Sequence, residues 1–457
     1  MAKKTIDRFS LRYSAFKLYV MLTHRLFYRR MQSKFRNRIP RNRPVLFAPN
    51  HQNALMDAMG PLMTSRRDPV FLARADVFKK KFIAGILRLF KILPVYRIRD
   101  GASELGKNED IFTEAMEVLG RKKCPVAIMP EGNHGDKRKL RPLVKGIFRV
   151  AFQAQENYGE NPGVVIVPIG MDYSRYSNFR GDMFIQYGEP IEVCEYYSEY
   201  KDNQPRAINS IRERLASEMR KYIIDIRSEE HYDTYMLLRQ TYNRRMCKRL
   251  SFRRRDLYHR LLADQYMIKE LARVEAEQGN NLSSLTEMGN EYSAGVDKLK
   301  LRDWVFEKSR YSVPGLILAS LGLLALLPVF LYGAILNSFP YWLTGKISDG
   351  LKDTQFRSSF KLVLGTFLFP ITYLILFIPV WLLTESWWIK WAFLISLPVI
   401  GLFSHTWYIW YKKIRSLWKY QALTMGNDKY LEKLKSLRNE INSQAESFIP
   451  DPTSIHT

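Results

Sequence analysis

Residues 44–203 contain short apolar runs separated by helical stretches. The runs of strand length are Val45–Ala48, Pro69–Ala73, Val126–Met129 and Val164–Ile169, and the stretches of helical character include Ala102–Leu119 and Pro142–Asn157. The segment from Gly188 to Ile191 predicts a loop that leads into a last edge strand. Strands that alternate with helices are typical of an α/β domain, here with a mostly parallel sheet flanked by helices.

Residues 204–310 predict a helical region without strands. Helix-forming and charged residues dominate three stretches, Ile211–Ile226, Tyr235–Leu250 and Leu257–Glu277. A polar connector is expected from Glu277 to Ser284, whose sequence is EQGNNLSS. We therefore expect helical hairpins between the α/β domain and the rest of the chain.

Residues 311–420 contain three long apolar runs, which are Ser312–Leu343, Phe360–Leu383 and Trp388–Tyr411. The last two are about 24 residues each, enough for a helix to cross the ~30 Å hydrocarbon layer of a membrane. Tryptophans typical of membrane interfaces lie near their ends, at positions 381, 387, 388, 407 and 410. This pattern predicts a transmembrane helical region, followed at 421–457 by a helical and flexible tail.

The distribution of basic residues predicts how this region crosses the membrane. Lysines and arginines precede the first run, follow it, and follow the last run, whereas the short loop 384–389 has none. Three simple crossings would place basic loops on both sides, against the positive-inside rule. A first run that forms a re-entrant or hairpin segment, broken near Pro328–Gly333, removes the conflict. The chain is then an integral protein of a bacterial inner membrane or the endoplasmic reticulum, with its α/β domain on the cytoplasmic face.

Residues 1–43 predict a basic amphipathic helix. No acidic residue occurs between Arg8 and Met56, and Leu11–Phe35 interleaves apolar side chains with arginine and lysine. Such a helix lies on an anionic membrane surface. The alternative is a helix that packs on the next domain and exposes a solvated basic face.

The composition agrees with a membrane partner. The 457 residues include 71 Lys+Arg against 45 Asp+Glu, a formal charge of +26 that favours polyanions or anionic lipid. The apolar runs favour a phospholipid membrane and argue against nucleic acid. The cysteines Cys124, Cys194 and Cys247 are far apart and odd in number, so neither a disulfide framework nor a CxxC zinc site is predicted.

A histidine and a carboxylate follow the first predicted strand, in the stretch NHQNALMD. His51 is expected on the turn after the strand, and Asn53 is expected to cap a helix whose first turn carries Asp57. A carboxylate that accepts a hydrogen bond from one imidazole nitrogen makes the other nitrogen a base that can deprotonate a hydroxyl. No serine or cysteine lies in this turn, so the hydroxyl is expected to belong to a substrate alcohol. The alternative is a helix-capping histidine beside an unrelated aspartate.

Further polar groups follow the other predicted strands. Arg74 comes after the second, Glu131 and Gly132 come after the third, and the fourth, VVIVPIG, contains Pro168. The stretch LRPLVKG, which follows Glu131, adds Arg141 and Lys145. Ligands of open α/β sheets bind at the carboxyl ends of the strands, so these groups are candidates for one site.

The four stretches NHQNALMD, FLARADVF, MPEGNHG…LRPLVKG and VVIVPIG, in this order, resemble the glycerolipid acyltransferase family of glycerol-3-phosphate and lysophosphatidate acyltransferases. The resemblance covers residues 44–193, and the apolar tail is similar to that of the longer glycerol-3-phosphate and dihydroxyacetone-phosphate acyltransferases, including fungal-type ones. Two departures stand out. Five residues instead of the usual four separate His51 from Asp57, and Asn133–Asp136 replaces the usual Thr-Arg, so that Lys137, Arg138, Lys139 or Arg141 is left to supply the charge for phosphate.

The resemblance implies a role for each candidate residue. His51 would be the general base and Asp57 would orient it, so that the acceptor hydroxyl attacks the thioester of acyl-CoA or acyl-carrier protein. Arg74 would bind the acceptor phosphate, Glu131 and Gly132 would line the acceptor site together with Arg141 and Lys145, and Pro168 would shape its floor. The resemblance implies neither a metal nor a bound cofactor.

The expected function is acylation of glycerol-3-phosphate in phospholipid biosynthesis. Lysophosphatidate, dihydroxyacetone phosphate and a lyso-aminolipid remain alternative acceptors, and the oligomeric state is open. Gly132-Asn133-His134 is also similar to the GNH element of metallophosphoesterases, but no Asp-x-His element precedes it. A membrane scaffold with an inactive acyltransferase domain is a further alternative.

Overall fold

The computed structural model describes residues 6–7, 10–79, 81–96, 106–159, 163–277 and 279–450. The chain divides into two compact units. The first comprises Met1–Asp225 together with Ser348–Val363, and the second comprises Ile226–Ile347 and Leu364–Thr457. The predicted fold class is confirmed, because a mostly parallel sheet with helices is followed by helices that include long apolar ones.

In the described part of the first unit, eight strands form one sheet in the order β1-β7-β6-β2-β5-β3-β4, with β8 paired to β6. Their bounds are β1 Arg30–Lys34, β2 Val45–Pro49, β3 Val70–Arg74, β4 Ile92–Val95, β5 Val126–Ala127, β6 Val165–Tyr173, β7 Asp182–Tyr187 and β8 Ile191–Glu192. The pairs β6–β7 and β6–β8 are antiparallel, and the other described pairs are parallel. The strands β6, β2, β5 and β3 therefore end at the same edge.

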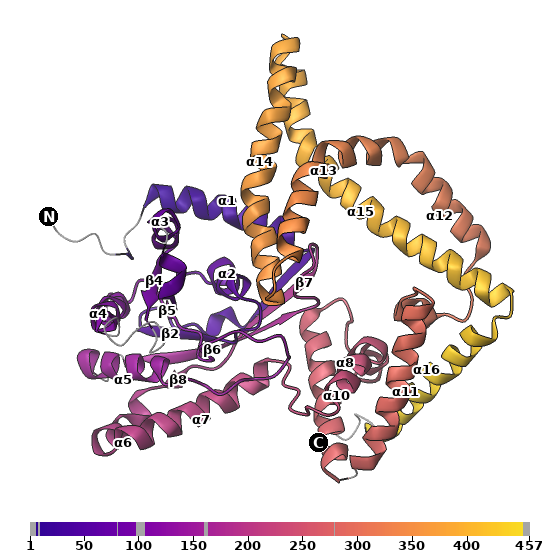
Figure 1. Ribbon diagram of the computed structural model, residues 1–457. Helices are drawn as coiled ribbons and strands as arrows, with labels where there is room; N and C mark the ends of the chain where they lie inside the picture. Colours follow the sequence, from indigo (N-terminus) through magenta and orange to yellow (C-terminus); the bar gives the residue numbers. More distant parts are fainter. Residues whose placement is uncertain are drawn as a thin grey trace. The chain divides into compact units, whose positions relative to one another are not determined.

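Helices cover both faces of this sheet. Figure 1 shows on one side the helices α1 (Leu11–Phe27), α2 (Leu55–Thr64) and α3 (Lys81–Leu89). The other side is covered by α5 (Gly146–Tyr158), α6 (Tyr197–Asp202) and α7 (Gln204–Tyr222). Helix α4 (Lys107–Gly120) packs on that second side as well. Alternate residues of β2 enter the two cores, since Val45 and Phe47 pack on the α1–α2 side and Leu46 and Ala48 on the α5–α7 side. Short 3-10 helices occur at η1 Arg36–Arg38, η2 Ala75–Phe78 and η5 Cys194–Tyr196.

Several element boundaries in this unit differ from the sequence-based expectations. The predicted first helix ends at Phe27, and Arg30–Lys34 forms β1 against β7. Arg29 and Arg30 both bind Asp182 of β7, so an ion pair across 152 residues holds this strand. Burial would raise the pKa of Asp182, but hydrogen bonds from Arg30 and Arg29 outweigh it and lower the pKa to about 2.

Other elements of the first unit also differ from the sequence-based expectations. Neither β4 nor β7 was expected, and α5 begins at Gly146, four residues after the predicted start. Helix α7 packs into the first unit through Ile211 and Leu215, although the sequence placed it with the helical region. The first residues of the helix predicted at Ala102–Leu119 lie outside the described residues, and the rest forms α4.

The second unit contains helices of two kinds. The polar ones are α8 Tyr232–Thr241, α9 Asn243–Arg249, α10 Leu257–Glu277, α11 Gly279–Lys298, the 3-10 helix η6 Asp303–Glu307 and α16 Lys429–Phe448. The helix predicted at Tyr235–Leu250 is broken at Tyr242. Residues 279–284 of the predicted polar connector are helical and form the start of α11. Helix α16 packs on α11, and Arg438 of α16 binds Asp303 of η6 (Nε–Oδ1 2.7 Å).

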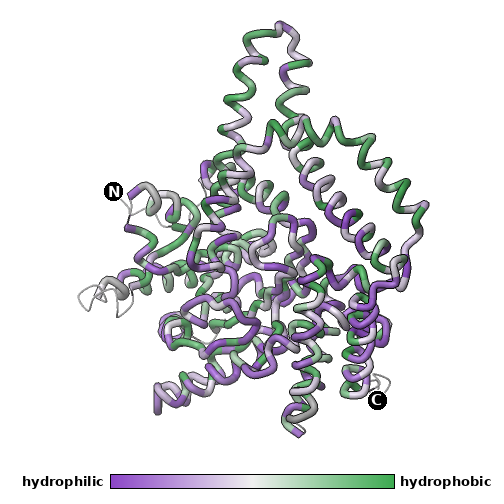
Figure 2. Tube along the Cα trace, turned by 45° about the vertical axis from the view of Figure 1, so that its right-hand side comes forward, coloured by the Kyte–Doolittle hydropathy of each residue, from purple (hydrophilic) through white to green (hydrophobic). Residues whose placement is uncertain are grey.

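The apolar helices are α12 Val313–Ala325, α13 Leu327–Asp349, α14 Arg357–Leu383, preceded by η7 Thr354–Phe356, and α15 Trp387–Met425. Among the described residues, Thr354–Leu383 and Trp387–Met425 are each long and apolar enough to cross a membrane, whereas α12 and α13 qualify only as a pair bent by 53°. Figure 2 shows the hydrophobic residues concentrated along these helices. The chain breaks at Leu326, two residues before the Pro328–Gly333 stretch where a break was expected. These helices indicate membrane association.

A buried polar side chain joins three of these helices. Asn337 of α13 donates to the carbonyl oxygens of Gly333 (2.9 Å) and, across to α15, of Leu397 (3.3 Å). The hydroxyl of Tyr373 on α14 donates to Asn337 Oδ1 (2.7 Å). A polar side chain surrounded by hydrocarbon is stable only with such partners, so Asn337 specifies how α13, α14 and α15 pack.

Gly170→Ala is expected to destabilise the first unit by ~1–3 kcal/mol, because the added methyl group would overpack the sheet. A Cβ at position 170 would lie 2.0 Å from the carbonyl oxygen of Tyr222, so the backbone itself must shift. Thermal unfolding of the purified protein measures the effect. Gly146→Ala is the control, since no atom lies within 4 Å of its Cβ position. Equal unfolding midpoints for the two variants would contradict the prediction.

Candidate active site

The sheet topology brings the predicted site residues to one edge. The neighbouring strands β6, β2, β5 and β3 run parallel, so their carboxyl ends meet. His51 follows β2 by two residues, Glu131 follows β5 by four, and Arg74 is the last residue of β3. This is the edge where open α/β sheets bind ligands.

His51 and Asp57 face each other as the sequence predicts. The distance from His51 Nδ1 to Asp57 Oδ2 is 2.9 Å. Asp57 is fully buried, whereas the imidazole keeps 16% of its side-chain surface exposed. A proton on Nδ1 is therefore held by the carboxylate, and Nε2 is the nitrogen left to accept a proton from a substrate.

Asp57 is fixed by three further hydrogen bonds. Its Oδ2 accepts from the backbone N–H groups of Gln52 (2.8 Å) and Asn53 (2.6 Å), and its Oδ1 accepts from the hydroxyl of Tyr173 on β6 (2.7 Å). The turn before α2 thus wraps around the carboxylate, and Ala54 adopts a positive φ of 45° to allow it. The expectation that Asn53 caps the helix is wrong, since α2 follows Ala54 without a side-chain cap and Asp57 binds the turn amides instead.

Glu131 and Arg141 hold the backbone of His51. Glu131 Oε1 accepts from the N–H of His51 (2.7 Å), and Arg141 Nη2 donates to the carbonyl oxygen of His51 (3.0 Å). Arg141 also binds Glu131 (Nε–Oε2 3.1 Å). Burial raises the pKa of Glu131, although the hydrogen bonds from His51 and Arg141 oppose the rise. Both side chains position the catalytic turn, and their contact with a substrate stays a prediction.

Gly132 allows the loop after β5 to reach His51. Its φ is +67°, and a Cβ there would lie 2.9 Å from Val144 Cγ1. The turn is closed by the N–H of Val144, which donates to the carbonyl oxygen of Pro130 (2.7 Å). A side chain at 132 would displace the carboxylate at 131, so the glycine is required by the backbone.

The other three predicted residues are not hydrogen-bonded to the His51 cluster in the described contacts. Arg74 pairs with Asp76 two residues away, through Nε and Oδ1 at 3.1 Å. Lys145 is exposed at the start of α5. Pro168 is buried in β6 beside Ala48 of β2, three residues before His51. Their roles in substrate binding stay predictions.

A segment far along the chain completes the cluster. Residues 348–363 comprise the end of α13, the connection to α14 and the first residues of α14, and this α13–α14 link belongs to the first unit. The ring of His134 packs edge-on against His51 (ring centroids 5.5 Å) and against Phe356 of this segment (4.8 Å). Burial lowers the pKa of His134, which favours its neutral form. The side-chain amide of Gln355 contacts His134 Nδ1, and when its nitrogen faces the ring its oxygen accepts from the N–H of Asp136 (2.9 Å).

Two serines fasten the same segment to the catalytic turn. Ser358 donates to Asn53 Oδ1 (2.6 Å), and Ser359 Oγ accepts from the N–H of Leu55 at the start of α2 (3.2 Å). Leu362 is buried in the core between α1, α2 and the sheet. The link between two apolar helices is thus part of the wall around His51.

Sequence reasoning missed Tyr173, Gln355 and Ser358. Tyr173 is the last residue of β6, four residues beyond the end of the strand predicted at Val164–Ile169, and its hydroxyl binds Asp57. Ser358 lies 305 residues from Asn53, and Gln355 lies 221 residues from His134, so a single sequence holds no local signal for such pairs. His134 was considered only as part of the GNH element. Among the described residues, no group of three or more His, Cys, Asp or Glu side chains is placed to hold the metal that this alternative requires.

The acyltransferase family profile matches residues 30–172, the sheet and loops that carry this cluster. This segment is an acyltransferase-family domain. Glycerol-3-phosphate O-acyltransferase 2 of Saccharomyces cerevisiae is 29% identical over 134 residues, 29% of this chain and 17% of the yeast protein. Glycerol-3-phosphate O-acyltransferase 1 of the same yeast is 22% identical over 272 residues, 54% of this chain and 32% of its own length.

A human relative carries a different acceptor in its name. The 1-acyl-sn-glycerol-3-phosphate acyltransferase beta of Homo sapiens is 28% identical over 142 residues, 31% of this chain and 45% of the human protein. The matches therefore span less than half the length of each of these relatives. They confirm the resemblance to glycerol-3-phosphate and lysophosphatidate acyltransferases, and they leave the acceptor unresolved.

Tyr173→Phe is expected to lower kcat for acyl transfer about tenfold, equivalent to ~1.4 kcal/mol of transition-state stabilisation. The ring volume is kept, but Asp57 Oδ1 loses its donor and the carboxylate is less well held against His51. Steady-state kinetics should show little change in KM. Tyr158→Phe, which removes a hydroxyl bonded to the Met116 carbonyl oxygen (2.7 Å), is the matched control. Equal kcat values for the two variants would show that the Tyr173 hydroxyl does not support catalysis.

Gln355→Ala is expected to lower kcat/KM about three- to tenfold, because His134 loses the contact that fixes its ring against His51 and small misplacements are costly in an active site. Lys352→Ala, an exposed change in the same link, is the control and should keep wild-type kinetics. The two variants are compared in the same membrane preparation at matched expression. A normal rate for Gln355→Ala would remove the link from the functional site.

Proposed function

We propose that this protein is a membrane-bound glycerolipid acyltransferase that moves a fatty acyl group from acyl-CoA or acyl-carrier protein to a hydroxyl of glycerol-3-phosphate. The observation that carries the proposal is the His51–Asp57 pair, in which the fully buried Asp57 holds His51 Nδ1 at 2.9 Å while the imidazole keeps 16% of its side-chain surface exposed.

The pair accounts for each step of the transfer. His51 Nε2 takes the proton of the acceptor hydroxyl as its oxygen attacks the thioester carbonyl carbon. The carbon–sulfur bond then breaks, and the thiolate takes the proton back from His51 as it leaves. Asp57 stays ionised and stabilises the imidazolium during the transfer. General base catalysis of this kind contributes ~10²–10⁴ in rate.

Glycerol-3-phosphate is proposed as the acceptor on the basis of the names of the yeast relatives and of one cation at the edge of the sheet. Both yeast relatives are named as glycerol-3-phosphate acyltransferases, and the better-covered one aligns over 54% of this chain. Arg74, at the carboxyl end of β3, is the cation proposed to bind the acceptor phosphate, because a guanidinium presents a fork of donors to phosphate oxygens. Lysophosphatidate is the second candidate, favoured by the human relative.

The contacts made where the apolar helices begin and end support one arrangement of these helices in the membrane. The link between α13 and α14 is bound to the catalytic turn, and α16, which follows α15, packs on α11 before α12. No candidate span lies between the catalytic domain and α11 in the described residues. We infer that all four ends lie on the cytoplasmic side, that α14 and α15 form a membrane hairpin, and that the bent pair α12–α13 enters and leaves the same leaflet.

Helix α1 supports contact with the membrane surface. Leu11, Leu18 and Leu22, which recur at helical spacing, are 57–76% exposed. The exposed Arg12 and Arg25 are on the same helix. Exposed leucines beside arginines are typical of helices that lie in the interface of an anionic membrane, so this helix is proposed to keep the catalytic edge close to lipid.

His51→Ala is expected to lower acyl transfer ~10²–10⁴-fold, the contribution of a general base. The assay follows release of free thiol from acyl-CoA by purified protein in phospholipid vesicles, with glycerol-3-phosphate as the acceptor. Membrane attachment should be unchanged, since the side chain lies outside the apolar helices. Wild-type turnover by purified His51→Ala would refute the catalytic assignment.

The same assay across acceptors decides the substrate. Glycerol-3-phosphate is expected to give the highest kcat/KM, and lysophosphatidate, dihydroxyacetone phosphate and a lyso-aminolipid are compared at equal concentration. Arg74→Gln should raise KM for a phosphorylated acceptor while leaving KM for acyl-CoA unchanged. A higher kcat/KM with lysophosphatidate would replace the first assignment by the second, and thiol release independent of any acceptor would refute both.

A further inference from the structure

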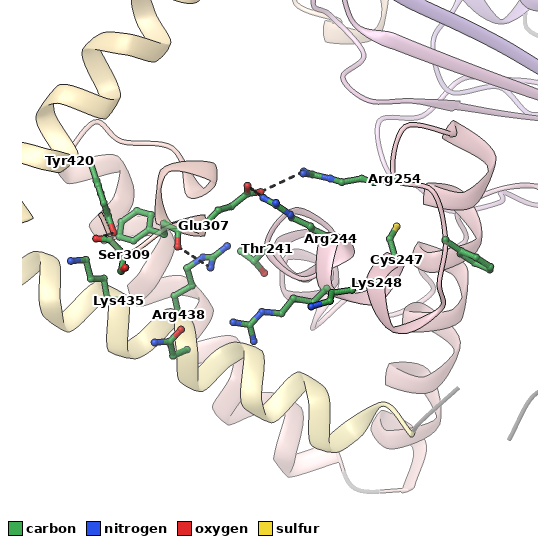
Figure 3. Close-up of a pocket in the computed structure, with 14 residues that line it drawn as sticks. Thr241, Arg244, Cys247, Lys248, Arg254, Glu307, Ser309, Tyr420, Lys435 and Arg438 are labelled. Carbon is green, nitrogen blue, oxygen red and sulfur yellow. Dashed lines mark hydrogen bonds and ion pairs between the residues drawn. The ribbon is translucent and has the colours of Figure 1, made fainter. Parts of the chain in front are cut away.

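The second unit contains a cavity of about 790 Å³ that the acyltransferase reaction does not use. Figure 3 shows side chains from α9, η6, α15 and α16 turned toward it. Its volume is that of sites for small organic ligands, which range over ~300–1,000 Å³. All of its lining residues belong to the second unit, so it is separate from the His51 cluster.

The lining is strongly cationic. Six lysines and arginines face the cavity together with a single carboxylate, Glu307, and the cations are Arg244, Arg245, Lys248, Arg254, Lys435 and Arg438. Three of them are neutralised by carboxylates outside the lining, since Arg245 binds Glu446 (3.2 Å), Lys435 binds Glu432 (2.7 Å) and Arg438 binds Asp303 (2.7 Å).

Two of the remaining three cations share one carboxylate. Arg244 and Arg254 both approach Glu307, the latter at 3.6 Å. Lys248 has no ion pair among the described residues, and it points toward the same space (Figure 3). A formal surplus of two positive charges is therefore concentrated at the wall formed by α9. Burial, with the charges of Arg244 and Arg260, lowers the pKa of Arg254.

The lining also contains three aromatic side chains. Phe252, Phe306 and Tyr420 contribute faces to the cavity. A free phosphate ion would fill only a small part of this volume, so an organic group attached to the phosphate has room to rest on the rings. A dianionic phosphate monoester would match the surplus of two charges, and guanidinium groups bind phosphate through paired N–H donors.

We propose that this cavity binds the phosphate group of an organic phosphate ester, at a site distinct from the acyl-transfer site. Two sources offer this group, a water-soluble phosphate ester and the headgroup of an anionic phospholipid. Tyr420 lies nine residues beyond Tyr411, where the apolar part of α15 ends, or about 14 Å along a helix. A soluble ester can enter the cavity from water at this distance from the apolar part of α15. A lipid headgroup would bind only at the opening of the cavity.

The test uses the full chain carrying His51→Ala, so that acyl transfer cannot contribute and the result is independent of the proposed function. The protein is placed in phosphatidylcholine nanodiscs, and its thermal unfolding midpoint is measured at constant ionic strength with adenosine 5′-monophosphate, inorganic phosphate or chloride. A second set of nanodiscs contains phosphatidic acid without added ester. Ligands that bind the folded state raise the midpoint.

Substitutions locate the effect. Lys248→Gln should weaken binding about tenfold, because a charge-assisted hydrogen bond to phosphate is lost. Lys269→Gln, an exposed lysine of α10 outside the lining, removes the same charge from the same unit and should leave binding unchanged. Glu307→Gln should tighten binding, since it frees Arg244 and Arg254 from their shared carboxylate.

The outcomes separate the two sources and the failure of the proposal. A midpoint raised by adenosine monophosphate or phosphate in phosphatidylcholine, and reduced in Lys248→Gln, supports a soluble ester. If the unfolding midpoints of the proteins with and without Lys248→Gln differ only in nanodiscs that contain phosphatidic acid, the result supports a lipid headgroup. If no phosphate source raises the midpoint more than chloride, or if Lys248→Gln and Lys269→Gln respond alike, the proposal is overturned.

Discussion

The buried carboxylate of Asp57 is the constraint on which the catalytic edge depends. A carboxylate without solvent must find hydrogen-bond donors, and Asp57 finds them in the imidazole of His51, two turn amides and the hydroxyl of Tyr173. Four donors on one group decide the path of the turn, including the strained φ at Ala54. The imidazole is thereby held in one orientation before any substrate arrives, which is the preorganisation that general base catalysis requires.

A second buried carboxylate supports the first from the other side of the turn. Glu131 accepts from the N–H of His51, and Arg141 donates to the carbonyl oxygen of His51. The backbone of His51 is therefore held in place as well as its ring. In this arrangement the hydrogen-bonding groups of Glu131 and Arg141 are engaged by the turn and by each other. The same residues that the sequence suggested as substrate ligands thus have a structural role, and it explains why they lie beside the base.

The link between α13 and α14 joins membrane attachment to the active site. Residues on this link contact Asn53, Leu55 and His134, and the link itself begins and ends in apolar helices. A displacement of these helices would therefore move the wall around His51. In the proposed reaction an acyl acceptor and a fatty acyl donor meet at the surface of a membrane, and the link would tie the His51 edge to the helices that associate with that membrane.

The sequence by itself determined the α/β class, the apolar helices and the His51–Asp57 pair, because each depends on residues close together in the chain: strand alternation, apolar length, and a carboxylate one helical turn after a loop. Tertiary structure alone decided that β1 pairs with β7, that Ser358 reaches Asn53, that Gln355 reaches His134, and that Asp57 rather than Asn53 organises the start of α2. The first three contacts join residues more than a hundred positions apart, and Asp57 is also bound by Tyr173, 116 residues away. Nothing in the local pattern of one sequence records them, since they arise only when the sheet and its two cores have folded.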